Sequence, residues 1–247
     1  MRRSDTGGRS WEPATVVLSD PSNSSEFDAV LTYEPVGNAL ILVYQDMKVG
    51  DLCAPCVQNV RRSSTYGRSW DAPTQLPSVN TTGGGGVSSG IVLTRGEYKG
   101  RVLVPQRHDC HGCSGTRNSF ALISDDKGET FRGGALLPHG WSECQMAELQ
   151  NGSVVITSRN DGDKTRASYR LFARSDDGAE TWATTWESDD SLPDPRCQAA
   201  LLGDPGAGVL YFGHPSSPHS RVNYSVHISR NGGLSWELHA QIYAGGS

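Results

Sequence analysis

Several kinds of segment are missing from this chain of 247 residues. No apolar run approaches the length of about 20 residues that a helix needs to span a bilayer. No basic stretch offsets the net charge of −5, which argues against nucleic acid as a partner. The glycine run at residues 83–86 lacks the Gly-Lys-Ser/Thr ending of a phosphate-binding loop, so we interpret it as a connection between structural units.

Helical patterns are also missing, since no helix longer than one turn is convincing. Short β-rich runs bounded by Gly, Pro, Asn or Asp take their place. The composition is that of a globular chain, and a single all-β domain can reach this length. The predicted strands cover residues 29–33, 39–44, 57–63, 87–94, 101–106, 120–124, 153–159, 169–175, 209–213 and 224–229.

One short turn sequence recurs five times along the chain. The copies occupy residues 4–11, 63–70, 124–131, 175–182 and 229–236. Their spacing of about 50 to 60 residues is typical of the four-stranded blades of a β-propeller. In the third copy, from Ser124 to Phe131, Ser and Asp can bond the backbone of their own turn, Gly supplies an unusual dihedral angle, and the aromatic ring fills an apolar gap. We therefore interpret the repeat as a folding device.

Four positions depart from the repeat pattern. Thr6, Thr65 and Asn231 replace the Asp, and Ala179 replaces the Gly of the fourth copy. We expect the turns that contain these replacements to be looser than the third one.

The repeat resembles the Asp-box of the sialidase (neuraminidase) family, where it joins the third and fourth strands of each blade. The resemblance implies an all-β, six-bladed propeller, of which this chain supplies about four whole blades plus partial ones. The first box lies close to Met1 and the chain stops soon after the fifth box. We therefore expect residues 1–247 to form one partial propeller domain, truncated at both ends.

The segment at residues 140–159 carries the chemistry. Glu143-Cys144-Gln145, a second glutamate at Glu148, and a strand ending in Arg159 resemble the sialidase segment with the catalytic glutamate and the second arginine of the substrate clamp. By this resemblance Glu143 activates a nucleophilic tyrosine and Arg159 binds the substrate carboxylate, whereas we interpret Glu148 as a structural partner. The overall texture is most similar to animal lysosomal-type sialidases.

A second match follows the turn Gly213-His214-Pro215, which resembles the family's His-Pro turn before the third clamp arginine and makes Arg221 the candidate. The chemistry of arginine supports these assignments, because guanidinium groups bind a sialic acid carboxylate bidentately without losing charge. A tyrosine at its ordinary pKa near 10 needs a base to act as a nucleophile. Taken singly, each candidate has a plainer interpretation: Glu143 as a solvated acid, Arg159 as a partner of Asp161, and Arg221 as a surface residue.

Three family features are missing from the chain: the Phe-Arg-Ile-Pro motif with the first clamp arginine, the loop with the acid aspartate, and the Gly-Pro-Ser-x-Tyr-Ser context of the nucleophile. Tyr243 lies on the wrong side of the corresponding turn, so it is not assigned the role of nucleophile. The context of Asp5, Asp28 and Asp109 does not resemble the acid loop. We therefore expect this chain alone to have little or no hydrolytic activity.

Two Cys-x2-Cys pairs fall between the predicted second and third strands of adjacent blades. Disulfides, free thiols, and zinc with His108 and His111 are alternative explanations of these pairs. Cys144 and Cys197 are expected to be core or loop thiols. The pairs are Cys53 with Cys56 and Cys110 with Cys113, and the four Asn-x-Ser/Thr sequons lie at Asn23, Asn80, Asn151 and Asn223. Together the cysteines and sequons favour a secretory or lysosomal location.

The resemblance predicts an exo-α-sialidase that acts on sialylated glycoproteins, glycolipids or oligosaccharides and uses no cofactor or metal. One alternative is a non-catalytic propeller that binds sialic acid or another glycan. Another is an Asp-box propeller that binds peptides. The presence of Glu143 favours the enzyme, because a lectin needs no activator of a tyrosine.

Overall fold

The computed structural model describes residues 1–18, 24–48, 57–76, 89–108, 117–162, 169–188 and 190–246. Within these ranges the chain forms 16 strands and, as the sequence predicted, no helix. The described part accordingly holds no helix that is long and apolar enough to cross a membrane.

The strands form four antiparallel sheets of four strands, here called blades 1 to 4, and each blade takes its strands in chain order. Blade 1 comprises β1 (Ser24–Glu34), β2 (Ala39–Lys48), β3 (Val57–Ser63) and β4 (Thr74–Gln75). Blade 2 comprises β5 (Ile91–Val92), β6 (Val102–His108), β7 (Asn118–Ser124) and β8 (Arg132–Gly133). Blade 3 comprises β9 (Trp141–Glu148), β10 (Val154–Asn160), β11 (Leu171–Ser175) and β12 (Thr184–Glu187). Blade 4 comprises β13 (Ala200–Asp204), β14 (Val209–Pro215), β15 (Tyr224–Ser229) and β16 (Glu237–Tyr243).

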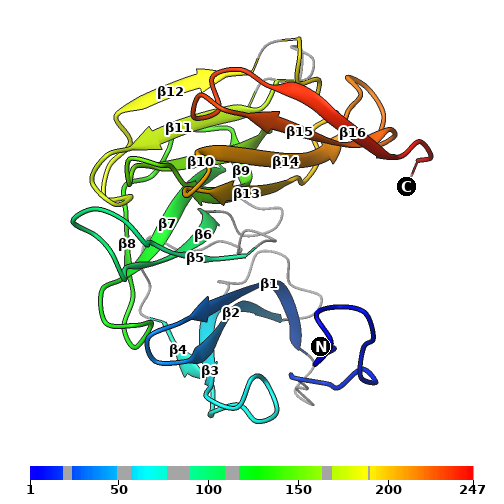
Figure 1. Ribbon diagram of the computed structural model, residues 1–247. Coiled ribbons are helices and arrows are strands. Elements are labelled where there is room, and N and C mark those ends of the chain that lie inside the picture. The colour runs from blue at the N-terminus through cyan, green and yellow to red at the C-terminus, as the bar shows by residue number, and fades with distance from the viewer. Residues whose placement is uncertain are drawn as a thin grey trace.

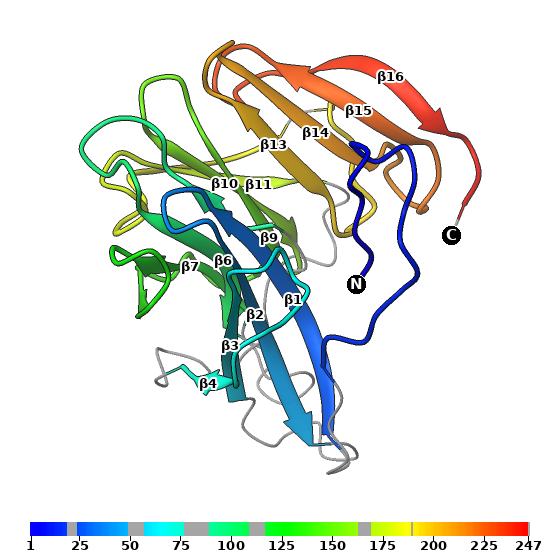
Figure 2. The ribbon, with the colours of Figure 1, turned by 60° about the horizontal axis from the view of Figure 1, so that its bottom comes forward.

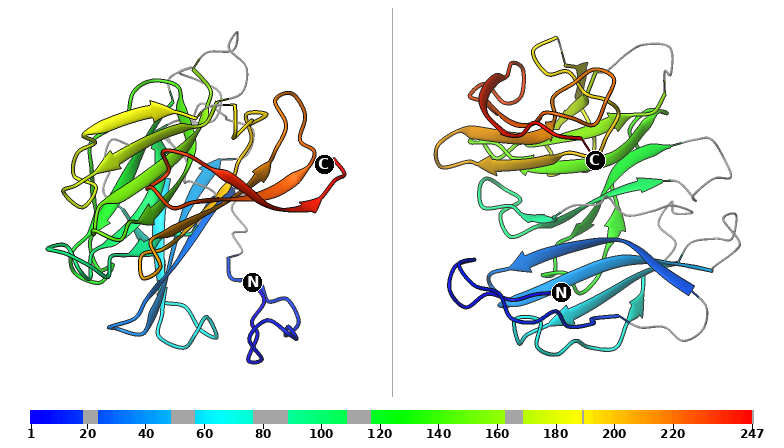
Figure 3. Two further views of the ribbon diagram at one scale, coloured as in Figure 1. Left: turned by 45° about the horizontal axis from the view of Figure 1, so that its top comes forward. Right: turned by 90° about the vertical axis from the view of Figure 1, so that its right-hand side faces the viewer.

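The blades follow one another in an arc, and both ends of the chain lie on its open side (Figure 1). The first strands of the blades are neighbours, since β1 contacts β5, β5 contacts β9, and β9 contacts β13. Figure 2 labels three of these first strands, β1, β9 and β13. Seen from the side, the sheets follow one another face to face (Figure 3). This is the arrangement of blades in a β-propeller, and it confirms the predicted all-β propeller fold with four whole blades.

Three apolar clusters fill the spaces between neighbouring blades. Strand alternation produces them, because successive side chains point to opposite faces of a sheet. In β6, Val102 and Val104 join the cluster between blades 1 and 2, while Leu103 joins the cluster between blades 2 and 3. In β10, Val155 belongs to a third cluster, between blades 3 and 4. The inner strands β6 and β10 are therefore buried on both faces, and each stabilises two interfaces.

The repeated turns join the third and fourth strands of each blade and bond to themselves. In the third copy, Ser124 Oγ accepts the Gly128 N–H at 2.8 Å, and Asp126 Oδ1 accepts the Thr130 N–H at 2.9 Å. Burial raises the pKa of Asp126, but hydrogen bonds from Thr130, Ser124 and Glu129 outweigh it and lower the value to about 2. The turn is thus closed by bonds between residues of one short segment.

The expectation of looser turns at the substituted positions was wrong. The side-chain oxygens of Thr6, Thr65 and Asn231 each accept the backbone N–H four residues further on, at 2.9, 2.8 and 3.0 Å. Ala179 donates its N–H to Ser175 Oγ at 2.8 Å, although its φ of 72° lies in the left-handed region that favours glycine. A hydroxyl or amide oxygen replaces the carboxylate as acceptor, so the closing bonds keep their lengths.

The first box, at residues 4–11, precedes blade 1 and docks against the second box. Arg3 Nη1 donates to the carbonyl oxygen of Gly67 at 3.0 Å, and Arg61 Nη1 donates to that of Val17 at 2.9 Å. Residues 1–18 form no strand. The first box therefore lies beside blade 1 in the place where a neighbouring blade would present its own box.

Candidate functional site

The candidate catalytic residues lie at the end of the blades opposite the boxes. In an antiparallel meander the ends of the second strands face away from the turns between the third and fourth strands. Arg159 lies near the end of β10, and Glu143 lies near the start of its neighbour β9. The register shifts between Ser158 and Asn160, and irregularities of this kind redirect side chains next to active sites.

The structure brings Glu143 and Arg159 into contact. Arg159 Nη1 donates to Glu143 Oε2 at 3.2 Å, and Arg159 Nε donates to Asp161 Oδ1 at 2.8 Å. Burial opposes the charge of Arg159, but the carboxylates of Asp161 and Glu143 outweigh it and raise the pKa of the guanidinium. Asp161 is the partner that we expected if Arg159 were only a structural residue. Arg159 forms this contact and the contact with Glu143 at the same time.

Further charged residues extend this pair across three blades. Arg107 at the end of β6 places Nη1 3.8 Å from Glu143 Oε1, and its Nη2 donates to Asp28 Oδ2 in β1 at 3.0 Å. Arg117, just before β7, donates to Asp161 Oδ2. Burial raises the pKa of Asp161, but Arg159 and Arg117 outweigh it and lower the value. The result is a row of alternating charges with Glu143 between two arginines.

Arg221 lies in the loop between β14 and β15, which is at the same end of the blades. Its side chain is exposed, and no described residue forms an ion pair or a hydrogen bond with it. The structure therefore places Arg221 at the same end of the blades as Glu143 and Arg159 without bringing it into contact with either residue.

Comparison with known proteins identifies the repeat unit. The sequence model of the BNR repeat-like domain family matches residues 1–246. The chain belongs to this family. Over its whole length the BNR-repeat domain is 27% identical to a sialidase of Micromonospora viridifaciens, of which it spans 41%. It is also 34% identical to human Sialidase-4 over 43% of the chain, which is 24% of that protein. The similar proteins therefore include both a bacterial and a human sialidase.

Solved structures with the same fold are also sialidases. The Hadza microbial sialidase Hz136 superposes on 99% of this BNR-repeat domain with a TM-score of 0.86 and 18% identity, and the domain covers 52% of it. Trypanosoma rangeli sialidase in complex with the inhibitor DANA superposes on 99% with a TM-score of 0.77 and 20% identity, and 44% of it is covered. The fold is therefore a sialidase-type β-propeller, and the chain spans about half or less of these relatives.

Glu148 has the contacts of a structural residue in the BNR-repeat domain. Its carboxylate accepts hydrogen bonds from Thr94 N, Thr94 Oγ1 and Arg95 N at 2.6 to 3.0 Å. It ties the end of β9 to the loop after β5. This is the role of structural partner that the sequence predicted.

Cys144 is buried and inert as a nucleophile. Its Sγ donates to the carbonyl oxygen of Gln106 at 3.2 Å, and burial raises the pKa of the thiol to about 12. Neither Cys144 nor Cys197 forms a disulfide. Asp109 and the four cysteines of the two Cys-x2-Cys pairs lie outside the described residues, so the disulfide, free-thiol and zinc alternatives stay predictions.

A buried polar cluster joins residues of blades 3 and 4. Arg170 Nη1 donates to the carbonyl oxygen of Cys197 at 2.6 Å and to Asp194 Oδ2 at 3.4 Å. His214 Nε2 lies 3.3 Å from His227 Nδ1. Burial, together with His227 and Arg170, lowers the pKa of His214 to about 3, so this histidine is neutral. Burial also lowers the pKa of His227, so both histidines have a neutral, structural role.

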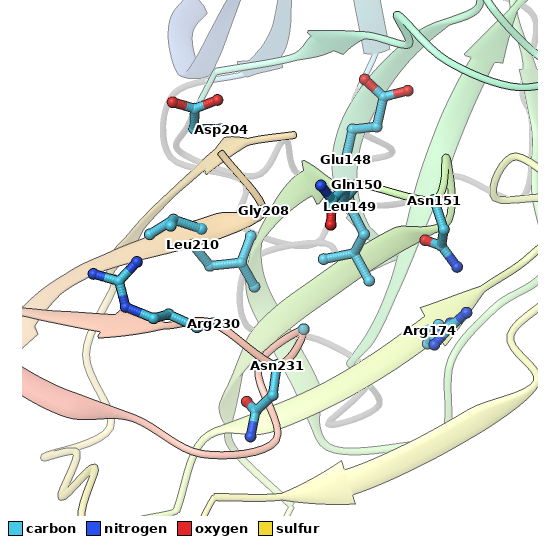
Figure 4. A pocket seen from close by; sticks show the side chains of 12 residues that line it. Glu148, Leu149, Gln150, Asn151, Arg174, Asp204, Gly208, Leu210, Arg230 and Asn231 are labelled. Atoms are coloured by element: carbon cyan, nitrogen blue, oxygen red, sulfur yellow. The ribbon is translucent and has the colours of Figure 1, made fainter. Parts of the chain in front are cut away.

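A groove of about 450 Å³ lies at the box end, between blades 3 and 4 (Figure 4). Its walls include Arg174, Asp204, Arg230 and Asn231. Arg174 is already engaged, because its Nε donates to Asp176 Oδ1 at 2.9 Å. The groove contains neither Glu143 nor either clamp arginine, so it is separate from the candidate site.

Sequence reasoning missed Arg107 and Arg117 and set Asp28 aside. Arg107 lies one residue beyond the predicted strand at 101–106, as Arg159 lies at the end of its own strand. The position at the end of a second strand was the available signal. Nothing in the local sequence indicated the contact with Asp28, because that residue lies 79 positions earlier.

Proposed function

We propose that this BNR-repeat domain is the part of an exo-α-sialidase that carries the glutamate of the Tyr/Glu pair and two arginines of the carboxylate clamp. The observation that carries the proposal is the contact of Glu143 with Arg159 at 3.2 Å, at the non-box end of a propeller whose curated relatives are sialidases. Substrates are the terminal sialic acids of glycoproteins, glycolipids or oligosaccharides.

The geometry supports two roles in this reaction. Arg159 uses Nε and Nη1 for Asp161 and Glu143, and Nη2 takes part in neither bond, so it is available to the substrate carboxylate. Arg221 is exposed and can bind the same carboxylate from the loop after β14. Glu143 would accept the proton of the nucleophilic tyrosine, and a neutral nucleophile avoids repulsion by the negatively charged substrate.

Turnover of a fluorogenic sialoside by the protein encoded in the complete reading frame tests the proposal. We expect hydrolysis by that protein and little or none by residues 1–247 alone, because catalytic groups that act as a unit lose most of their effect when some are removed. Arg159→Lys and Arg221→Lys should weaken binding of sialosides more than they lower the melting temperature. Unchanged binding in both variants would contradict the clamp, and clear turnover by the isolated chain would contradict its predicted inactivity.

A second candidate function is glycan binding without hydrolysis. It would use the arginines without a nucleophile, and the exposed side chain of Arg221 is available for it. Binding of a sialoside to the complete protein without release of sialic acid would establish this function and exclude the enzyme.

A secretory or lysosomal location is part of the same proposal. Asn151 is exposed in the turn between β9 and β10, where a glycan can be accommodated, whereas Asn223 is partly buried and its Oδ1 accepts a bond from Gln241. Asn23 and Asn80 lie outside the described residues. Mass spectrometry of the natural protein should find a glycan at Asn151 before Asn223, and unmodified Asn151 would argue against this route.

A further inference from the structure

Glu143 is held from two sides by arginines of different blades. Arg159 in blade 3 binds Oε2 at 3.2 Å, and Arg107 in blade 2 lies 3.8 Å from Oε1. The side chains of Arg107 and Glu143 are 10% and 17% exposed, so water screens this pair less than a surface pair. The carboxylate therefore has a counter-ion on each oxygen.

Arg107 is itself fixed by an irregular part of β1. Its Nη2 donates to Asp28 Oδ2 at 3.0 Å. The pairing of β1 with β2 shifts between Phe27 and Val30, and Asp28 has a φ of 51°. A bulge of this kind redirects a side chain, and here it turns an acid of blade 1 toward an arginine of blade 2. Nε of Arg107 is buried and has no hydrogen-bond partner among the described residues, so Asp28 and Glu143 leave part of the guanidinium unused.

The two arginines around Glu143 have different freedom to take a second ligand. Under the proposed function Arg159 also binds the substrate carboxylate, which competes with Glu143 for the same guanidinium. Arg107 is buried against Asp28 on the other side, so it stays with Glu143 when Arg159 takes the substrate. A base must keep its geometry at that moment, because a displacement of about 1 Å can reduce a rate about 100-fold.

We propose that Arg107, fixed by Asp28, is a positioning residue that keeps the Glu143 carboxylate in place while Arg159 binds the substrate. This inference rests on the proposed sialidase function. It assigns a role to Asp28 of β1 and Arg107 of β6, neither of which is an arginine of the proposed clamp.

Steady-state kinetics of the complete protein test this role. Arg107→Gln should lower kcat about 100-fold with KM within about threefold of wild type, and Arg107→Lys should recover part of kcat. Asp28→Asn should lower kcat by a smaller factor and still fold. The matched control is Arg132→Gln, because Arg132 pairs with Asp125 at 2.9 Å at the box end, and its kcat should be unchanged. A raised KM with unchanged kcat in Arg107→Gln, or wild-type kcat in all three site variants, would overturn the proposal.

A spectroscopic test does not depend on turnover. In residues 1–247 labelled with 15N-arginine, the Nε–Hε signal of Arg107 is assigned by its loss in Arg107→Lys. That signal should move in Glu143→Gln and stay in place in Glu12→Gln, since Glu12 pairs with Arg3 at 2.7 Å in the N-terminal segment. An Arg107 signal with the same chemical shift in the wild type and in Glu143→Gln would overturn the positioning role. A complete wild-type protein without sialoside turnover would instead refute the proposed function, and the labelled chain would still decide whether Arg107 holds Glu143.

Discussion

The two ends of the blades are built in different ways. At the box end, the closing bonds join residues two to four positions apart, such as Ser124 with Gly128. At the other end, the ion pairs join residues from separate blades: Arg107 and Asp28 are 79 positions apart, and Arg117 and Asp161 are 44 apart. The box turns are therefore closed by short-range bonds, whereas the contacts of Arg107 and Arg117 depend on the packing of blades.

This difference explains why the box tolerates substitution. Any side chain with a suitable oxygen can accept the N–H four residues further on, since both groups lie in the same turn, and Thr65 does so at 2.8 Å as well as Asp126 does at 2.9 Å. At the site end the partners of Arg107 and Arg117 are positioned by other blades. A change of charge there leaves a partly buried partner without its counter-ion, which is costly.

The largest expected effect is a loss of activity from a substitution at the site end. Glu143→Gln in the complete protein should lower kcat about 1,000-fold, because the amide keeps the shape of the side chain and cannot accept a proton. The melting temperature should change by only a few degrees, since Gln can still accept a bond from Arg159. Hydrolysis of a fluorogenic sialoside measures kcat, and a thermal melt measures the melting temperature. Retained kcat would show that Glu143 is not the base.

The next effect concerns stability against pH at the buried histidines. The folded pKa of His214 is about 3, below its ordinary value of 6.5, so the unfolded chain binds more protons between these values. The contribution of His214 to stability is therefore complete above about pH 6.5 and is lost as the pH falls toward 3, with a slope of up to about 1.4 kcal/mol per pH unit.

Replacing His214 tests that slope. His214→Gln should flatten the fall in the free energy of unfolding between pH 6.5 and 4, measured by urea titration at each pH. Exposed His239 is the matched control, and His239→Gln should leave the slope as it is in the wild type. Equal slopes in the wild type and His214→Gln would refute the assignment.

A smaller effect is expected at the third box. Asp126→Ala removes the acceptor of the Thr130 N–H and should lower the free energy of unfolding by about 1 kcal/mol, or the melting temperature by about 2–4 °C. Because the folded pKa of Asp126 is lowered to about 2, this contribution is present above its ordinary value of 3.8 and is lost as the pH falls through 2. Sialoside turnover should be unaffected. A loss of turnover without a loss of stability would contradict the purely structural role of the box end.

The smallest effect is a gain in stability at the fourth box. Ala179 has a φ of 72°, and glycine adopts this angle without strain, so Ala179→Gly should raise the free energy of unfolding by about 0.5 kcal/mol. Gly128 is the matched position in the third box, where an added methyl group would meet Ile41, and Gly128→Ala should destabilise the protein. Thermal melts of both variants should shift in opposite directions.

The sequence predicted the strands best where they adjoin a box. The predicted strands 57–63 and 224–229 coincide with β3 and β15, both of which lead directly into a box. The sequence predicts no strand at β9 or β13, and within the described residues 89–94 of the predicted run at 87–94 the named strand is Ile91–Val92. These are first strands on the inside of the arc, where contacts with neighbouring blades determine the pairing.

By itself, the sequence determined the blade repeat and the box turns. Each of these depends on side chains that are close along the chain or on neighbouring strands of one hairpin. Only the tertiary structure decided that Arg107 from blade 2 and Asp28 from blade 1 join Glu143, and that Arg117 shares Asp161 with Arg159. The physical reason is that these contacts depend on how whole blades pack and on bulges that redirect single side chains.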